Sequence, residues 1–75
     1  MPEYTVLLTW DAEAAVWMAS SDDIPGLVLE SGSLDALMER VRFAAPELME
    51  LNGEPPETVS MCFRSERREQ VRLYG

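Results

Sequence analysis

Four acidic residues come nearest to an arrangement that could do chemistry in this sequence. Asp11 and Glu13 lie in a short polar segment, and Asp22 and Asp23 stand side by side just before Ile24-Pro25-Gly26. Carboxylates bind hard cations, and carboxylate pairs hold the metal ions of many nucleases. One hypothesis is therefore a stand-alone small-ligand-binding or metal-binding domain, or an enzyme, that uses Asp11, Asp22 and Asp23. Acids in turns are also commonplace, and the simpler interpretation is that all four are solvated.

The residues on which most enzymes rely are missing from the sequence. It has no histidine, so the commonest general base and the usual zinc ligand are lacking, and Ser20 and Ser21 have no base to activate them. Cys62 is the one cysteine, which excludes an internal disulfide and indicates a small packed side chain. No glycine-rich loop follows a strand pattern, so a phosphate-binding site is not indicated. We therefore expect no catalytic residue, no cofactor and no metal, and predict that the protein is not an enzyme.

The charge of the chain is negative and unevenly distributed. The formal net charge is −8, with twelve acids and two arginines in residues 1–63, but four arginines and two acids in residues 64–75. An acidic body repels nucleic-acid phosphates and attracts basic partners. Two interpretations stay open, because the acidity either serves a basic partner or only keeps a small protein soluble. In both cases we expect no direct binding to nucleic acid.

One amphipathic segment, residues 33–52, is predicted to be the helix that closes the core. Ser33 suits the N-cap because its hydroxyl can accept a hydrogen bond from a first-turn N–H, and Asn52-Gly53 suits the end. Pro46 lacks the N–H that would bond to the carbonyl of Arg42, which predicts a kink or a break. The apolar residues repeat at about 3.6 positions and form one stripe: Leu34, Leu37, Met38, Val41, Ala45, Leu48 and Met49.

Four segments have the composition or the period-two alternation of strands. They are residues 4–10, 14–20, 27–30 and 58–64, and Ile24-Pro25-Gly26 predicts a type II turn between the second and the third. The order βββαβ indicates a two-layer α+β fold with one helix on one face. An antiparallel meander and a right-handed crossover predict a mixed sheet in the order 3-2-1-4, with the fourth strand parallel to the first. This is the arrangement of the first half of a ribonuclease-H-like sheet.

A single helix covers only one face of such a sheet, so a substantially apolar outer face is expected. Two registers of the second strand stay open: one places Val16 and Met18 beside Leu7 on the outer face, and the other places Trp17 there. Phe43 falls on the polar side of the helix, unless a kink turns it inward. Exposed apolar patches of this kind usually mark an interface.

The C-terminal segment, residues 65–75, is polar at first and ends in Val71-Arg72-Leu73-Tyr74-Gly75. It could extend the fourth strand, return as a hairpin or pair with another chain. A chain of 75 residues buries a modest core and gains stability from self-association. We therefore predict a homodimer or a larger homo-oligomer. The candidate interface residues are Trp17, Phe43, Val71, Leu73 and Tyr74.

The length of the sequence indicates a single domain over residues 1–75. The sequence shows no signal peptide and no apolar run near the length of a membrane span. Together with the single cysteine, these features predict a cytoplasmic protein that does not associate with membranes.

Three stretches resemble a family of short bacterial proteins classed as a domain of unknown function, within the HicB-like antitoxin superfamily. They are WDAEAAVW at residues 10–17, SDDIPGL at residues 21–27 and PELMELN at residues 46–52. The resemblance covers roughly residues 4–52, about two thirds of the chain. The likeness to the HicB-like superfamily rests on the Pro-Gly loop after the second strand and on the βββαβ order. We call this loop the motif loop, and its residues are Asp22, Asp23, Ile24, Pro25, Gly26 and Leu27.

This resemblance implies a partial ribonuclease-H-like fold without ribonuclease-H catalysis. HicB-like antitoxins bind a small basic toxin that cleaves messenger RNA, and they mask its active site. Many also carry a C-terminal DNA-binding domain, for which residues 65–75 leave no room, so repression by direct DNA binding is not expected. The resemblance thus favours a non-catalytic protein-binding module over the alternative of a ligand-binding or metal-binding domain.

Overall fold

Four strands and one helix occur in the order βββαβ within residues 2–53 and 57–74, the part of the chain that the computed structural model describes. The elements are β1 (Glu3–Asp11), β2 (Val16–Ser20), β3 (Val28–Ser31), α1 (Leu34–Leu51) and β4 (Ser60–Glu66). Each of the predicted elements is present, with ends that differ by at most two residues. The predicted α+β class is confirmed.

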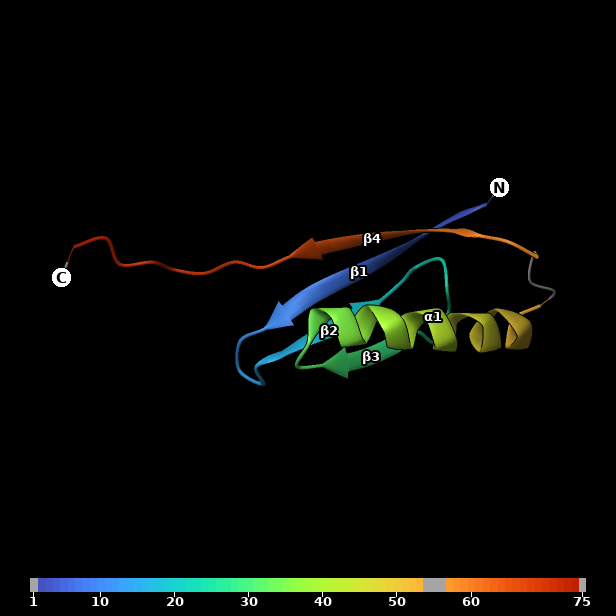
Figure 1. Ribbon diagram of the computed structural model, residues 1–75, viewed down its shortest axis with the longest axis horizontal. Coiled ribbons are helices and arrows are strands. Elements are labelled where there is room, and N and C mark those ends of the chain that lie inside the picture. Colours follow the sequence, from blue (N-terminus) through green and yellow to red (C-terminus); the bar gives the residue numbers. More distant parts are fainter. Residues whose placement is uncertain (1, 54–56, 75) are drawn as a thin grey trace.

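The strands form one mixed sheet in the order β3-β2-β1-β4, as the sequence predicts. β2 is antiparallel to both of its neighbours, β1 and β3, and β4 pairs with β1 in parallel. α1 crosses one face of the sheet between β3 and β4, so that β4 returns at the far edge (Figure 1). A mixed sheet with a single crossover helix follows from these connections.

The register between β1 and β2 decides which side chains face the helix. Leu8 pairs with Ala19 and Trp10 with Trp17, so these four residues share the side of the sheet on which α1 lies. The register that would place Trp17 on the outer face is therefore wrong, since the Trp17 ring packs against the core and meets Trp10 edge-on at 5.5 Å between ring centroids. The other register holds, and Val16 and Met18 lie on the outer face.

α1 is one continuous helix, so the alternative of a break at Pro46 is wrong. Its N-cap is Ser33, whose Oγ accepts a hydrogen bond from the backbone N–H of Ala36 at 3.3 Å, as predicted. A proline inside a helix costs about 3 kcal/mol. Burial offsets that cost here, because Leu37, Val41 and Ala45 are fully buried on the stripe that faces the sheet. Tertiary packing thus overrides the local preference of Pro46.

Phe43 stays exposed on the solvent side of α1, with 73% of its surface accessible. The possibility that a kink at Pro46 turns this ring inward is therefore not realised. The helix lies mainly over β2 and β3 (Figure 1), which leaves the β1–β4 half of the same sheet face less covered.

Residues 67–74 continue past β4 without forming a strand or a hairpin and lead away from the body of the molecule (Figure 1). Strand β4 itself runs two residues beyond Arg64. The described chain measures 56 × 22 × 18 Å along its principal axes, and this segment accounts for the long dimension. We call residues 67–74 the tail.

The turn between β1 and β2 holds one strained residue. Ala15 has a φ of +55°, a left-handed conformation that costs an L-residue roughly 1 kcal/mol. We expect Ala15→Gly to raise the free energy of unfolding by about 0.5–1 kcal/mol, because glycine adopts this conformation without a steric penalty. Thermal unfolding followed by circular dichroism measures the change. Ala14→Gly, at a neighbouring position without a positive φ, is the control and should give no gain.

Candidate functional site

The motif loop is built around a tight turn from Ile24 to Leu27. The N–H of Leu27 donates to the carbonyl of Ile24 at 3.1 Å, and Gly26 has a φ of +87°. Proline at the second position and a left-handed residue at the third define a type II turn, which confirms the prediction. Ile24 and Leu27 point into the core and are almost fully buried. The loop therefore contributes to the core as well as joining two strands.

Side chains of the loop attach it to the first strand beyond the end of β2. The Oγ of Ser21 donates to the carbonyl of Thr5 at 2.6 Å, and the N–H of Thr5 donates to Oδ2 of Asp23 at 2.7 Å. The N–H of Asp23 in turn donates to Ser21 Oγ at 3.1 Å. Because both backbone groups of Thr5 are bonded in this way, the side chains continue the ladder where β2 has ended. Asp23 is thus a structural acid.

The other end of the loop is attached to the end of α1. The side-chain amide of Asn52 donates to the carbonyls of Pro25 and Leu48, at 3.1 and 2.8 Å. A Cβ added to Gly26 would lie 3.3 Å from Cδ2 of Leu48, so glycine also permits the helix to approach. Two of the three stretches that carry the family resemblance, residues 21–27 and 46–52, therefore meet at this point. Their contact explains why Gly26 and Asn52 stand at these positions.

The acids of the alternative hypothesis, Asp11, Asp22 and Asp23, do not lie together. Asp11 lies at the hairpin end of the sheet, where its Oδ1 accepts from the N–H groups of Glu13 and Ala14 at 3.1 and 3.3 Å. Asp22 and Asp23 follow the opposite end of β2, and a five-residue strand keeps the two ends about 13 Å apart. Within residues 2–53 and 57–74, no three His, Cys, Asp or Glu side chains are grouped so that they could hold a metal ion. The hypothesis that joins Asp11 to Asp22 and Asp23 has no geometric support.

The outer face of the sheet has an apolar centre and an acidic rim. Leu7 lies near the middle and is 41% exposed, and Val28 on β3 is 70% exposed. The strand registers place four acids on this same face, together with Arg64 beside Leu7. The apolar members are Leu7, Val16, Met18, Val28 and Cys62, and the acids are Glu3, Asp11, Glu30 and Glu66. We call these side chains together the outer face.

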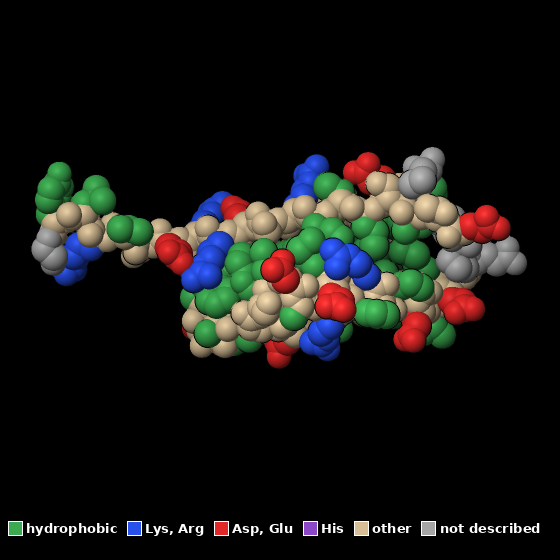
Figure 2. Space-filling model, viewed as in Figure 1, with side chains coloured by type: hydrophobic (Ala, Val, Ile, Leu, Met, Phe, Trp, Pro, Cys, Tyr) green, Lys and Arg blue, Asp and Glu red, His purple; other side chains and the backbone are tan. Residues whose placement is uncertain are grey.

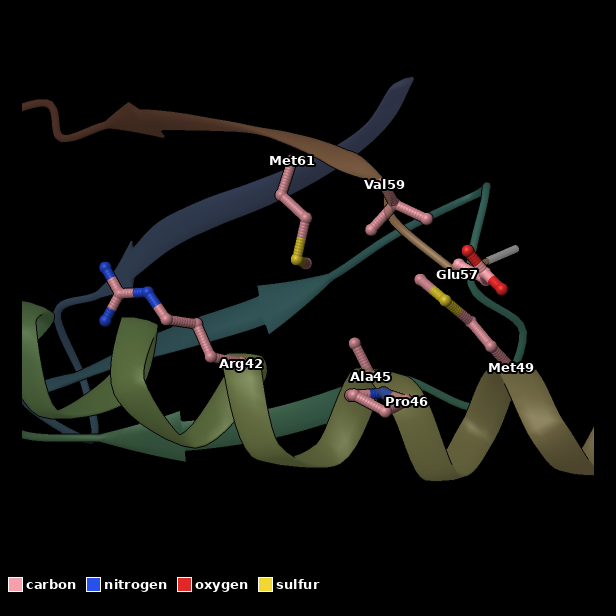
Figure 3. A pocket seen from close by; sticks show the side chains of 7 residues that line it. All are labelled: Arg42, Ala45, Pro46, Met49, Glu57, Val59 and Met61. Atoms are coloured by element: carbon pink, nitrogen blue, oxygen red, sulfur yellow. The ribbon is translucent and has the colours of Figure 1, made fainter. Parts of the chain in front are cut away.

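A second uncovered surface is a groove between α1 and β4 on the opposite side of the sheet. It encloses about 250 Å³ and opens to solvent where hydrophobic side chains gather between the helix and the strand (Figure 2). Figure 3 shows Met61 pointing from β4 toward the helix, with Ala45 and Met49 pointing back from α1. The lining residues are Arg42, Ala45, Pro46, Met49, Glu57, Val59 and Met61. We call this the α1–β4 groove.

The sequence did not indicate this groove, because the groove depends on which strands α1 packs against. Met49 belongs to the predicted apolar stripe and Met61 to the predicted alternation of the last strand, so each was expected to be covered. α1 lies over β2 and β3 instead, and both methionines remain only partly buried. The one local signal is Pro46, which lines the groove and cannot donate a hydrogen bond to the carbonyl of Arg42.

The start of the tail is held to the body by a cation–π contact that sequence spacing does not reveal. The guanidinium of Arg67 lies 3.9 Å from the ring centroid of Trp10 and is paired with Glu69 at 2.7 Å. Arg68 is paired with Glu66 at 2.8 Å. Cation–π contacts of this kind stabilise by about 0.5–1 kcal/mol at exposed sites. The parallel pairing of β1 with β4 makes them possible, since it places Thr9 opposite Glu66.

The candidate interface residues fall into three separate places. Trp17 is partly buried on the helix side, Phe43 is exposed on α1, and three residues of the tail are exposed. Val71, Leu73 and Tyr74 have 72%, 79% and 91% of their surface accessible. The structure therefore does not bring these five residues together into one patch.

The order of the elements, the sheet topology and the clamped loop define a small two-layer α+β domain. The chain belongs to the family described as a domain of unknown function (DUF1902), whose model matches residues 3–75. It is similar to a solved structure, the hypothetical protein TTHA1013 from the extremely thermophilic bacterium Thermus thermophilus. That structure is 37% identical over 95% of this chain and 99% of its own, with a TM-score of 0.72. A comparison with curated proteins found no match.

Within residues 2–53 and 57–74, no helix combines the length and the apolar character needed to cross a membrane. α1, with eighteen residues, carries charged side chains along its solvent face and buries the other face against the sheet.

Proposed function

We propose that this chain is a non-catalytic protein-binding module of the HicB type, which acts by masking a small basic protein that cleaves RNA. The outer face carries this proposal. Its apolar part, from Leu7 near the middle to Val28 on the edge strand β3, is uncovered in the chain, and acids from three strands lie around it. An apolar centre with a charged rim is the usual anatomy of a protein–protein interface.

The sign of the charge favours a basic partner. Residues 1–63 carry twelve acids and two arginines, and Glu3, Asp11 and Glu30 lie on the outer face itself. A basic partner would be steered toward this face at rates that fall as salt is added. The same charge repels nucleic acid, so the proposed module acts on the RNA-cleaving protein and does not bind RNA or DNA directly.

The proposal is tested by titrating the purified chain into a small basic RNA-cleaving toxin encoded beside a gene of this family. RNA cleavage should stop near a one-to-one ratio, while the chain alone should leave the RNA intact. Val28→Arg places a like charge at an exposed position of the outer face, and we expect it to weaken inhibition by about 30-fold, as for a hot-spot residue.

Phe43→Arg is the matched control, because it adds the same charge at a position with similar exposure on the far side of the helix. It should leave inhibition unchanged. An equal loss in both variants would show that net charge alone matters and would remove the outer face from the proposal. Undiminished RNA cleavage at a tenfold excess of the native chain would exclude this toxin as the partner and count against the proposed function.

A further inference from the structure

We infer that the end of the tail, residues 71–74, docks in the α1–β4 groove of a second copy of this chain. The predicted self-association then occurs through the tail of one copy and the α1–β4 groove of the other. The inference is independent of the proposed function, because the groove lies on the opposite side of the sheet from the outer face.

The groove has the size and lining to accept a few apolar side chains. Its volume of about 250 Å³ is below the range of about 300–1,000 Å³ typical of small-molecule sites. Met49 and Met61 provide flexible, polarisable walls, which adapt to different side chains. Polar groups are confined to its ends, where Arg42 and Glu57 lie apart from each other (Figure 3). Such a lining suits aliphatic side chains on an extended backbone.

Pro46 also shapes the helix wall of the groove. Pro46 has no N–H, so the carbonyl of Arg42 lacks the helical hydrogen bond that any other residue at position 46 would supply. Both residues line the groove. The ring of Pro46 instead stands against that carbonyl, and it adds an apolar surface to the groove.

The tail has the matching chemistry. Val71, Leu73 and Tyr74 are more than 70% exposed, and hydrophobic side chains gather at the end of the tail, far from the body (Figure 2). In an extended segment Val71 and Leu73 point to one side. Residues 71–74 then span about 10 Å, and α1 rises by about the same distance from Arg42 to Met49. The segment therefore matches the groove in length and polarity.

Direction and charge both favour the groove of a second copy over the chain's own groove. The groove is at the start of β4, near Val59 and Met61, whereas the tail leaves from the end of β4 at Glu66. The contact of Arg67 with Trp10 holds the base of the tail as it leads outward. Residues 64–75 carry a net charge of +2 and residues 1–63 a net charge of −10. Two copies related by a two-fold axis can exchange tails, and each contact then occurs twice.

The test is sedimentation equilibrium of the full chain at micromolar concentration. The native chain should be a dimer, and Val71→Asp with Leu73→Asp should weaken the dimer by about 100-fold or more, since four apolar anchors are lost per dimer. These tail positions do not pack on the body, so folding should be unaffected. Leu51→Asp is the control, because Leu51 is 82% exposed but does not line the groove, and it should leave the dimer intact.

A cross-link tests the position of the tail directly. In a Cys62→Ser background, Leu73→Cys with Met49→Cys should form a disulfide between chains on oxidation, seen as a covalent dimer under denaturing conditions. A native monomer, a dimer that survives both aspartates, or a cross-link confined to one chain would each overturn the inference. These results involve no toxin, so they are separate from failure of the proposed function.

Discussion

Ile24→Ala should unfold this domain or leave it barely stable at room temperature. Ile24 is fully buried although it lies in a loop, and it packs with Leu8 and Leu37 in the core. Truncation of a buried isoleucine to alanine costs about 2–5 kcal/mol, because the lost transfer energy is joined by the cost of a cavity. A domain of this size has a total margin of about 3–5 kcal/mol. One side chain in the motif loop can therefore account for most of the stability.

Urea unfolding followed by tryptophan fluorescence measures this effect, because Trp10 and Trp17 both change environment when the sheet opens. Val28→Ala is the control, at a position four residues further on that is 70% exposed, and it should change the free energy of unfolding by less than about 0.5 kcal/mol. All proteins must be compared at one concentration, since self-association would stabilise the folded state. A loss below about 1 kcal/mol for Ile24→Ala would contradict the placement of Ile24 in the core.

The strands, the helix and the sheet order could be predicted because local patterns determine them. The period-two alternation from Tyr4 to Trp10 and the 3.6-residue stripe from Leu34 to Met49 each have one apolar side that must be covered. The order of the elements then leaves few topologies. Even the type II turn follows from Pro25-Gly26, since these two residues restrict the backbone directly.

The register of β2 could not be predicted, because AAVWMAS is apolar on both sides of the strand. A period-two pattern carries information only when one face is polar. The left-handed conformation of Ala15 belongs to the turn that sets the register, and an alanine gives no local signal of a positive φ. The placement of Trp17 toward the helix therefore had to come from the structure.

The contacts of the motif loop were not predictable for a different reason. The bond from Thr5 to Asp23 joins residues eighteen positions apart, and that from Asn52 to Pro25 joins residues twenty-seven apart. In the sequence, two adjacent acids shortly before Pro25-Gly26 are as typical of a ligand-binding site as of a solvated turn. A carboxylate that accepts a backbone N–H at the end of a strand looks no different in sequence from one that binds a cation.

The two acids at the start of the motif loop should therefore respond differently to substitution. Asp23→Ala removes the carboxylate oxygen that lies 2.7 Å from the backbone nitrogen of Thr5, at a position of β1 that the pairing with β2 does not reach. Loss of a charged acceptor costs about 1.5–3 kcal/mol when buried, and solvent at this exposed carboxylate reduces the expected loss to about 1–2 kcal/mol. Asp22→Ala, at an exposed position one residue earlier, should stay within about 0.5 kcal/mol of the native protein.

Urea unfolding gives the two free energies, and amide hydrogen exchange shows whether the cause is the proposed one. Exchange at Thr5 should accelerate in Asp23→Ala and not in Asp22→Ala, because only Asp23 bonds to that N–H. Asp23→Asn keeps a side-chain oxygen as acceptor and should lose less stability than Asp23→Ala. Asp22→Ala and Asp23→Ala could instead lower the free energy of unfolding by the same small amount and leave amide exchange at Thr5 slow. That result would mean that the two acids do not hold the loop to β1. Their presence side by side would then again favour a ligand site at this end of the sheet.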